Sequence, residues 1–224
     1  MNVVITGATS GLGLNLAKEF CKKKHNVILA GRNVVKMKNL QRFITNESQL
    51  KNCHLFECDV QDPRQVESLG HFASIVYDKE IDHWINNAAI CEGPQNFTEV
   101  SMDDIRDVFS TNLLGTVYGV KVASIHNTKN IYIVNGHGSN GQSTPLFGLY
   151  GSSKAALSQL YSSLVAEDDI WKRVKILKPG MMKTNLSKKL LESDKYNTVQ
   201  KFFFNIITMD PNDIAKSIVD EITK

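Results

Sequence analysis

A tyrosine and a lysine four residues apart are the strongest candidates for chemistry in this 224-residue chain. In the segment Tyr150-x-x-x-Lys154 both side chains would leave the same face of a helix, one turn apart. A phenol with an ordinary pKa of about 10 is a poor base but a usable acid at neutral pH. A neighbouring ammonium and a positively charged ring nearby would stabilise the phenolate and lower that pKa. The pair therefore predicts proton transfer to or from an oxygen of a carbonyl or an alcohol.

A glycine-rich segment near the start of the chain is suited to holding a diphosphate. It follows an apolar run at residues 3–5 and has the spacing Gly-x-x-x-Gly-x-Gly, one residue longer than the common dinucleotide fingerprint. An ordinary glycine turn is the alternative. The position between a strand and a helix favours a nicotinamide dinucleotide, because helix N–H groups would meet the phosphates. The residues expected to bind it are Gly7, Thr9, Ser10, Gly11, Leu12 and Gly13.

The end of the next apolar run bears on which dinucleotide binds. An acidic residue there would bind the ribose 2′-hydroxyl, whereas a basic one accommodates a 2′-phosphate. This run ends in Ala30-Gly31-Arg32-Asn33 without an acid, and Lys36 and Lys38 follow. Arg32 and Asn33 therefore favour NADP(H) over NAD(H). A surface arginine that only caps a helix is the alternative.

Short apolar runs alternate with amphipathic stretches along the whole chain. We predict strands at residues 3–5, 26–30, 53–58, 83–85, 131–134 and 174–177. We predict helices at residues 12–24, 34–43, 64–77, 102–109, 111–125, 147–167 and 213–222. This alternation is typical of βαβ units, so we expect a Rossmann-type doubly wound parallel sheet of about six strands with helices on both faces. The chain shows no repeat or linker, and residues 1–224 are expected to form a single domain.

Composition excludes several other functions. A net charge of +3, a pI of about 8.6 and no dense basic stripe argue against nucleic acid. No apolar run approaches the roughly 20 residues of a membrane span. The four cysteines lack metal-ligand spacing, so we expect no metal and reduced thiols. Because the first strand starts at once, with no room for a targeting peptide, we expect a cytoplasmic protein.

Six motifs together resemble the short-chain dehydrogenase/reductase family, in the order of that family and over the whole chain. They are the glycine segment, Asp59-Val60, Asn86-Asn87-Ala88-Ala89, Asn112, Tyr150-x-x-x-Lys154 and Pro179-Gly180-x-x-x-Thr184. The resemblance implies an oxidoreductase that moves a hydride between a nicotinamide dinucleotide and a carbonyl carbon.

The resemblance also implies roles for individual residues. Asp59 and Val60 would hold the adenine, and Asn87 and Ala88 would line the cofactor cleft. The nicotinamide or diphosphate end would meet the segment that contains Pro179, Gly180, Met182 and Thr184. Tyr150 would contact both cofactor and substrate, Lys154 would bind the nicotinamide ribose, and Asn112 would help to hold a proton-relay water.

One family feature is displaced in this chain. Members usually carry a serine about a dozen residues before the tyrosine, where it binds the substrate carbonyl oxygen. Here the segment is Asn135-Gly136-His137-Gly138-Ser139, with His137 or Gly138 nearest that position. We expect Ser139 to take the role, with His137 as a substitute donor; a loop that merely turns is the alternative for His137.

Within the family, residues 84–88 and 110–115, the loop around Ser139 and the stretches that follow it resemble the chlorophyll b reductases. That likeness implies reduction of the chlorophyll b formyl group to hydroxymethyl, and it adds the periphery of a photosynthetic membrane as an alternative to an ordinary cytoplasmic location. An apolar substrate lid is expected at about residues 185–210, which suits a large apolar ring or simply packs onto the core. Its apolar residues are Leu186, Leu190, Leu191, Phe202, Phe203, Phe204, Ile206 and Ile207.

Other functions and assemblies stay open at this point. A reductase of the same chemistry could act on a smaller aldehyde, ketone or alcohol. A non-catalytic NADP(H)-binding regulator is a third possibility, against which Asn112, Tyr150 and Lys154 argue. The family's usual seventh strand is missing after the helix at 213–222, so we favour a homodimer or a monomer.

Overall fold

A six-stranded parallel sheet forms the centre of this computed structural model, which describes residues 1–48, 52–78, 80–142, 145–167, 170, 172–198, 201 and 207–224. The strands are β1 (Asn2–Thr6), β2 (Asn26–Gly31), β3 (Cys53–Glu57), β4 (His83–Asn86), β5 (Asn130–Val134) and β6 (Val174–Leu177). Their order across the sheet is β3-β2-β1-β4-β5-β6, and every neighbouring pair is parallel. The predicted Rossmann-type fold is confirmed.

The central strand β1 explains why the apolar runs are continuous rather than alternating. Val4 pairs with Ile28 of β2 on one side and with Trp84 of β4 on the other. Val3, Val4 and Ile5 are all fully buried. Both faces of a parallel sheet are covered by helices, so successive side chains are buried whichever way they point.

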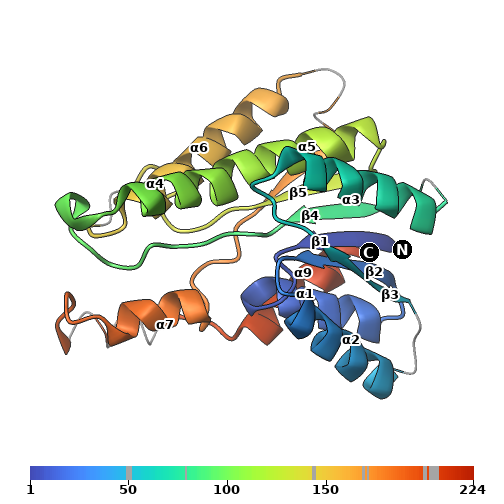
Figure 1. Cartoon of the computed structure of the whole chain (residues 1–224), viewed down its shortest axis with the longest axis horizontal. Helices are drawn as coiled ribbons and strands as arrows, with labels where there is room; N and C mark the ends of the chain where they lie inside the picture. Colours follow the sequence, from blue (N-terminus) through green and yellow to red (C-terminus); the bar gives the residue numbers. More distant parts are fainter. Residues whose placement is uncertain are drawn as a thin grey trace.

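Two layers of helices cover the sheet (Figure 1). One layer contains α1 (Gly11–Lys22), α2 (Val34–Ser48) and α9 (Pro211–Ile222). The other contains α3 (Pro63–Val76), α4 (Met102–Phe109), α5 (Gly115–Ile125) and α6 (Gly148–Leu164). Leu16 and Phe20 of α1 pack with Ile218 of α9 in the first layer, whereas Leu69 of α3 and Leu157 of α6 pack on Trp84 in the second.

The described helices depart from the predicted ones in four places. Residues 110–114 form a π-helical turn, η2 (Ser110–Leu114), which joins α4 to α5. The two helices predicted at 102–109 and 111–125 are therefore parts of one continuous helical segment. A helix α7 (Asn185–Glu192) and a short 3₁₀ helix η1 (Phe97–Glu99) were not predicted. The second helix ends at Ser48, five residues later than predicted. Every described helix is too short or too polar to cross a bilayer.

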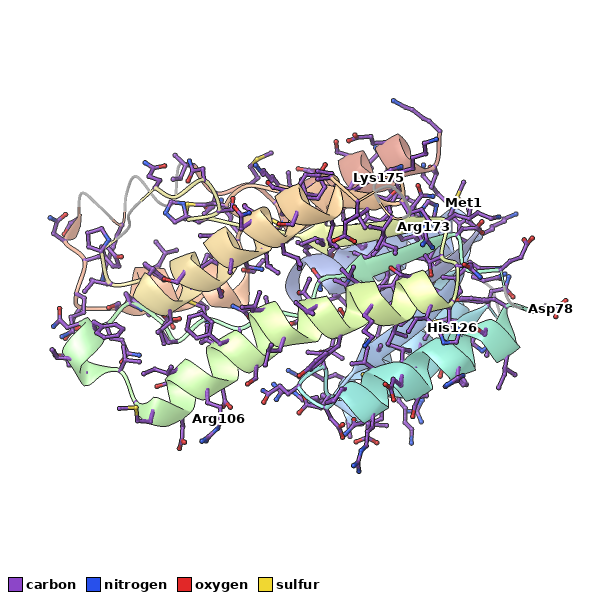
Figure 2. The ribbon with its side chains drawn as sticks, turned by 90° about the horizontal axis from the view of Figure 1, so that it is seen from above. Met1, Asp78, Arg106, His126, Arg173 and Lys175 are labelled. Atoms are coloured by element: carbon purple, nitrogen blue, oxygen red, sulfur yellow. The ribbon has the colours of Figure 1, made fainter. Side chains whose placement is uncertain are left out.

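The strand order fixes where a ligand can bind. The chain turns outward in opposite directions from β1 and β4, so their carboxyl ends leave a crevice between them, the usual ligand site of such sheets. Figure 2 shows Met1, Arg173 and Lys175 together at the opposite end, where β1 and β6 begin. In Figure 1, α4 and α7 extend past the end of the sheet at which the strands finish.

Close packing between α5 and β4 provides a test of the core. A Cβ at Gly119 would overlap the Asn86 amide oxygen, which accepts a hydrogen bond from Trp84 Nε1 at 3.0 Å. We expect Gly119→Ala to lower the free energy of unfolding by about 1–3 kcal/mol, measured by urea denaturation. Gly151→Ala is the matched control, because open space surrounds Gly151 on its helix. An equal effect of the two substitutions would contradict this packing.

Candidate active site

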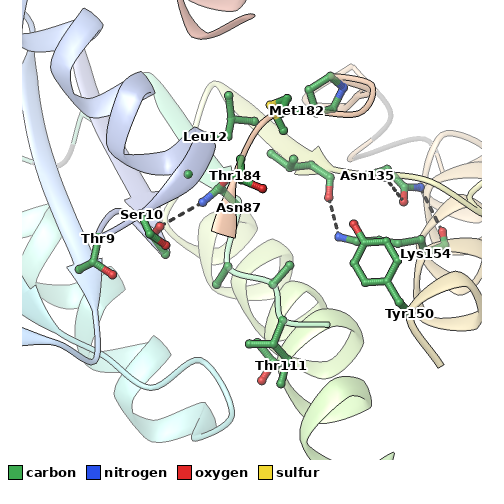
Figure 3. A pocket seen from close by; sticks show the side chains of 18 of the residues that line it. Thr9, Ser10, Leu12, Asn87, Thr111, Asn135, Tyr150, Lys154, Met182 and Thr184 are labelled. Atoms are coloured by element: carbon green, nitrogen blue, oxygen red, sulfur yellow. Dashed lines mark hydrogen bonds between the residues drawn. The ribbon is translucent and has the colours of Figure 1, made fainter. Parts of the chain in front are cut away.

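A single crevice of about 390 Å³ opens at the carboxyl ends of the strands (Figure 3). Thr9, Ser10 and Leu12 lie on one side of it and Tyr150 and Lys154 on the other. The sequence-predicted cofactor residues that line it are Gly7, Thr9, Ser10, Gly11, Leu12, Arg32, Asn33, Asp59, Val60, Asn87, Ala88, Tyr150, Lys154, Pro179, Gly180, Met182 and Thr184. His137 lines it as well, whereas Gly13, Asn112 and Ser139 do not.

The glycine turn between β1 and α1 has the shape that a diphosphate requires. Gly7 and Gly11 adopt left-handed φ angles of 65° and 53°. A Cβ at Gly7 would lie 2.7 Å from the Ala88 Cα, so only glycine fits this approach of two backbones. Ser10 begins α1 without using its side chain as a cap. The first N–H groups of α1 and the positive end of its dipole are therefore suited to phosphate oxygens.

Hydrogen bonds join the glycine turn to the end of β4. The Thr6 hydroxyl accepts from the backbone N–H groups of Asn87, at 3.1 Å, and Ala88, at 3.2 Å. The Asn87 side-chain amide donates in return to the carbonyls of Thr6, at 2.9 Å, and Gly7, at 3.2 Å. A Cβ at Gly13 would overlap the Asn87 amide, so Gly13 serves this packing and does not line the crevice.

The far end of the crevice carries the residues expected near the adenosine. The Arg32 guanidinium lies 3.7 Å from the Asp59 carboxylate, and both side chains are partly exposed. The Asn33 side chain accepts from the Lys36 backbone N–H at 2.9 Å, which closes the turn into α2. One cation and one anion thus border this end, where a ribose or its phosphate would lie.

Tyr150 and Lys154 share one face of α6, as their spacing predicts. The Lys154 ammonium is 5.6 Å from the centre of the Tyr150 ring and donates to the Val134 carbonyl at 3.2 Å. Lys154 is only 3% exposed, and this burial lowers its pKa to about 8.

The surroundings of Tyr150 disfavour ionisation of its phenol. Burial raises its pKa above the ordinary value, and the charges of Cys91 and Glu92 raise it further. The sequence predicted a lowered pKa for Tyr150 beside an ammonium and a positively charged nicotinamide ring. Without that ring, the pKa of Tyr150 is not lowered. A phenol in this state is a proton donor.

Asn135 fixes the position of α6 against β5. It was not predicted as a site residue from the sequence. Its amide nitrogen donates to the Lys154 carbonyl at 3.1 Å and to the Ser158 hydroxyl at 3.0 Å. Its amide oxygen accepts from the Gly136 N–H at 2.9 Å. A Cβ at Gly136 would lie 2.6 Å from the Tyr150 hydroxyl oxygen. The end of β5 therefore sets the position of both catalytic candidates.

The structure distinguishes the two candidates for the missing serine. Ser139 lies outside the crevice, and its carbonyl accepts from the Ser158 hydroxyl at 2.6 Å. Its N–H donates to the Gly136 carbonyl at 3.2 Å, so Ser139 helps to close the loop. The exposed His137 lines the crevice instead. The preference for Ser139 over His137 as the donor to the substrate oxygen is therefore not supported by this geometry.

Asn112 lies inside the protein, in the π-helical turn. Its amide oxygen accepts from the Ile90 N–H at 2.8 Å, and its nitrogen donates to the Ile90 carbonyl at 2.9 Å and to the Ser153 hydroxyl at 3.0 Å. The side chain therefore connects the loop after β4 to the catalytic helix. π-helical turns often occur at functional sites, because they shift backbone groups out of the regular helix.

An apolar cluster adjoins the phenol. It contains Cys91, Phe147, Tyr196, Leu146, Met181 and Tyr150 itself. The rings of Phe147 and Tyr196 stack with their centres 6.4 Å apart, and the Tyr196 hydroxyl donates to the Pro145 carbonyl at 3.3 Å. Tyr150 thus belongs both to the crevice and to an apolar surface beside it.

Part of the predicted lid is described. It begins with α7, whose first turn is closed by a capping box between Thr184 and Ser187; the Thr-x-x-Ser spacing was the sequence signal that we missed. Leu191 is half-buried and Ile207 is exposed. Phe202, Phe203, Phe204 and Ile206 lie outside the described residues, as do the side chains of Leu186 and Leu190.

Several lining residues were not predicted from the sequence. They are Gly31, Cys58, Ala89, Ile90, Thr111, Val134, Asn135, Gly136, Phe147, Met181 and Ser187. Many directly end a strand or follow one, and that position was the available signal. Among the described residues, no group of three or more His, Cys, Asp or Glu side chains is arranged to hold a metal ion.

Comparisons with known proteins identify the family to which this chain belongs. The family described as short chain dehydrogenase matches residues 1–195. The chain is 34% identical to the probable chlorophyll(ide) b reductase NYC1 of Arabidopsis thaliana, over 97% of this chain and 47% of that protein. It is 33% identical to the chlorophyll(ide) b reductase NOL of Oryza sativa subsp. japonica, over 99% and 66%. It is 30% identical to the NADP-dependent 3-hydroxy acid dehydrogenase of Schizosaccharomyces pombe, over 99% and 86%.

Among solved structures, that of the KRED1-Pglu enzyme is similar to this chain. The TM-score is 0.85 at 20% sequence identity, over 99% of this chain and 94% of that one. The chain belongs to the short-chain dehydrogenase/reductase family of oxidoreductases, which act on carbonyl and alcohol groups. It spans about half to two-thirds of the length of the two plant relatives. The crevice fits a nicotinamide dinucleotide, because its glycine turn leads into the N-terminus of α1, whose first N–H groups can meet a diphosphate.

The glycine turn provides a test of cofactor binding. We expect Gly7→Ala to weaken NADPH binding at least tenfold, because the new methyl group would push Ala88 away from the turn; fluorescence titration measures this. Gly141→Ala is the control, since Gly141 has a similar left-handed φ of 77° but open space around it. If Gly7→Ala bound NADPH as the unmodified protein does, the turn would not be the diphosphate site.

Burial of the Lys154 ammonium provides a second test. At pH 7 we expect cofactor-free Lys154→Met to be more stable than the unmodified protein by about 1–3 kcal/mol, because no charge is desolvated. The folded protein loses the Lys154 proton near pH 8 and the unfolded chain only near 10.5, so the unmodified protein gains stability across that window. The advantage of the variant should shrink by pH 10 in urea denaturation. Lys121→Met, at an exposed position on α5, is the control. An advantage of the same size at both pH values would contradict the burial argument.

Proposed function

We propose that this protein is an NADPH-dependent reductase that converts the formyl group of chlorophyll b, or of a similarly large apolar aldehyde, to hydroxymethyl. The observation that carries the proposal is the double contact of Tyr150, which lines the dinucleotide crevice and also belongs to the apolar cluster with Phe147 and Tyr196. A carbonyl bound at that boundary has its ring on apolar side chains and its oxygen at the phenol.

The reaction needs one hydride and one proton. Bound NADPH supplies the hydride to the carbonyl carbon. The Tyr150 hydroxyl donates its proton to the carbonyl oxygen as the negative charge forms there. The buried Lys154 ammonium stabilises the resulting phenolate, and solvent returns the proton. His137, at the rim of the crevice, supports the oxygen as a hydrogen-bond donor in place of the family's serine.

The preference for NADP(H) is also part of the proposal. Arg32 directly follows β2 at the crevice, and its guanidinium is partly exposed. A 2′-phosphate there would compete with the Asp59 carboxylate for this guanidinium. One relative is named an NADP-dependent enzyme, which supports the assignment. A bidentate guanidinium–phosphate contact is stronger than its 3.7 Å contact with Asp59.

A smaller carbonyl substrate is the second candidate. The 3-hydroxy acid dehydrogenase of Schizosaccharomyces pombe matches this chain over 86% of its own length, more than the plant reductases do. A short polar substrate would need only the crevice, His137 and Tyr150. The large apolar substrate additionally uses Phe147, Tyr196 and Met181, and this use of the cluster is why we favour it.

The proposed substrate also bears on where in the cell this protein works. Both plant relatives carry names that place them in the chloroplast, which favours work beside a photosynthetic membrane over the cytoplasmic location expected from the sequence. A homodimer or a monomer remains our proposal for its assembly.

Turnover with defined substrates tests the proposal. We expect NADPH oxidation with chlorophyll b and little with simple aldehydes, ketones or 3-oxo acids. Tyr150→Phe should lower kcat by about 10²–10⁴-fold and leave NADPH binding within a few-fold, because only the proton donor is lost. Tyr161→Phe, the same change further along α6, is the control. Turnover of simple carbonyls alone would establish the second candidate, and NADPH binding without turnover would establish a non-catalytic regulator.

A further inference from the structure

Glu92, in the loop after β4, contacts the first turn of the catalytic helix. One of its carboxylate oxygens accepts a hydrogen bond from the Tyr150 backbone N–H at 3.3 Å. Tyr150 is the third residue of α6, and Phe147, which precedes the helix, provides no side-chain cap. Glu92 therefore supplies from another segment the acceptor that helices usually obtain from their own N-cap residue.

The second carboxylate oxygen of Glu92 is buried and has no hydrogen-bond partner. None of the ion pairs in the described part of the chain includes Glu92. Among the described residues, the groups that offset its charge are the N–H groups and the positive dipole end of α6. The side chain is half-buried, so water screens its charge less than it would on an open surface, and the charge acts on its neighbours.

The groups around the phenol come from four segments. Lys154 lies on the same helix, Glu92 and Cys91 come from the loop after β4, His137 from the loop after β5, and Tyr196 from the segment after α7. The Lys154 ammonium favours the phenolate, whereas Glu92 disfavours it. The raised pKa of Tyr150 has burial as its main cause and the charges of Cys91 and Glu92 as the next ones.

We propose that Glu92 is a positioning residue, which holds the first turn of α6 through the Tyr150 amide and whose negative charge adds to burial in favouring the protonated Tyr150 side chain. Glu92 does not line the crevice, so it acts through Tyr150 and not on cofactor or substrate. The link to catalysis rests on the proposed function, since carbonyl reduction consumes the phenol proton and requires the protonated form at the start of each cycle.

The two contributions of Glu92 can be separated by two substitutions. Glu92→Gln keeps an oxygen for the Tyr150 N–H and removes the charge, whereas Glu92→Ala removes both. Titration of Tyr150 is followed by the ultraviolet absorbance of tyrosinate in the cofactor-free protein, as the difference from the same protein carrying Tyr150→Phe. Asp107→Asn, which removes an exposed carboxylate from α4, is the control.

We expect Glu92→Gln to lower the pH at which Tyr150 ionises by about one unit and to leave the melting temperature nearly unchanged. Glu92→Ala should lower both, and Asp107→Asn neither. Because the absorbance titration uses neither substrate nor cofactor, a shift there supports the proposal whatever carbonyl the enzyme reduces. An unchanged Tyr150 titration in Glu92→Gln would overturn it.

Discussion

The buried ammonium of Lys154 is the constraint on which the rest of the site depends. A charged group with 3% of its surface exposed is costly unless polar groups surround it, and here the Val134 carbonyl at the end of β5 accepts its hydrogen bond at 3.2 Å. The Asn135 side chain donates a hydrogen bond to the backbone carbonyl of Lys154. Residues at the end of β5 therefore hold both the backbone and the ammonium of this lysine. One helical turn away, the Tyr150 phenol has little freedom to move from the crevice. The sheet thus positions a proton donor through the lysine beside it.

The crevice has one part built mainly of backbone groups and another built of apolar side chains. The glycine turn, its hydrogen bonds to Asn87 and the N-terminus of α1 can hold a diphosphate with backbone groups alone. The cluster around Phe147 and Tyr196 has no role in that task, and its side chains set what can approach the phenol. Tyr150 joins the two parts.

Most of the fold could be predicted, because continuous apolar runs such as Val3 to Ile5 occur only where both faces of a strand are covered. The glycine turn and the Tyr150 and Lys154 pair depend on local spacing, which the sequence displays directly. The π-helical turn at Asn112 could not be predicted, since a tertiary contact with Ile90 and Ser153 stabilises it. Asn135 and Glu92 were missed for the same reason: each acts through a hydrogen bond to a residue distant in sequence. Which loop residue faces the crevice, Ser139 or His137, could not be predicted from spacing alone.

The central claim is that Tyr150 and Lys154 meet the reactive ring of a bound nicotinamide dinucleotide. A crystal structure with NADPH tests it most directly. The account predicts that the nicotinamide lies against the Tyr150 hydroxyl and that the Lys154 ammonium comes within about 3 Å of a hydroxyl of the nicotinamide ribose. A dinucleotide whose nicotinamide lies away from both side chains, or whose diphosphate avoids the Gly7 turn, would contradict it.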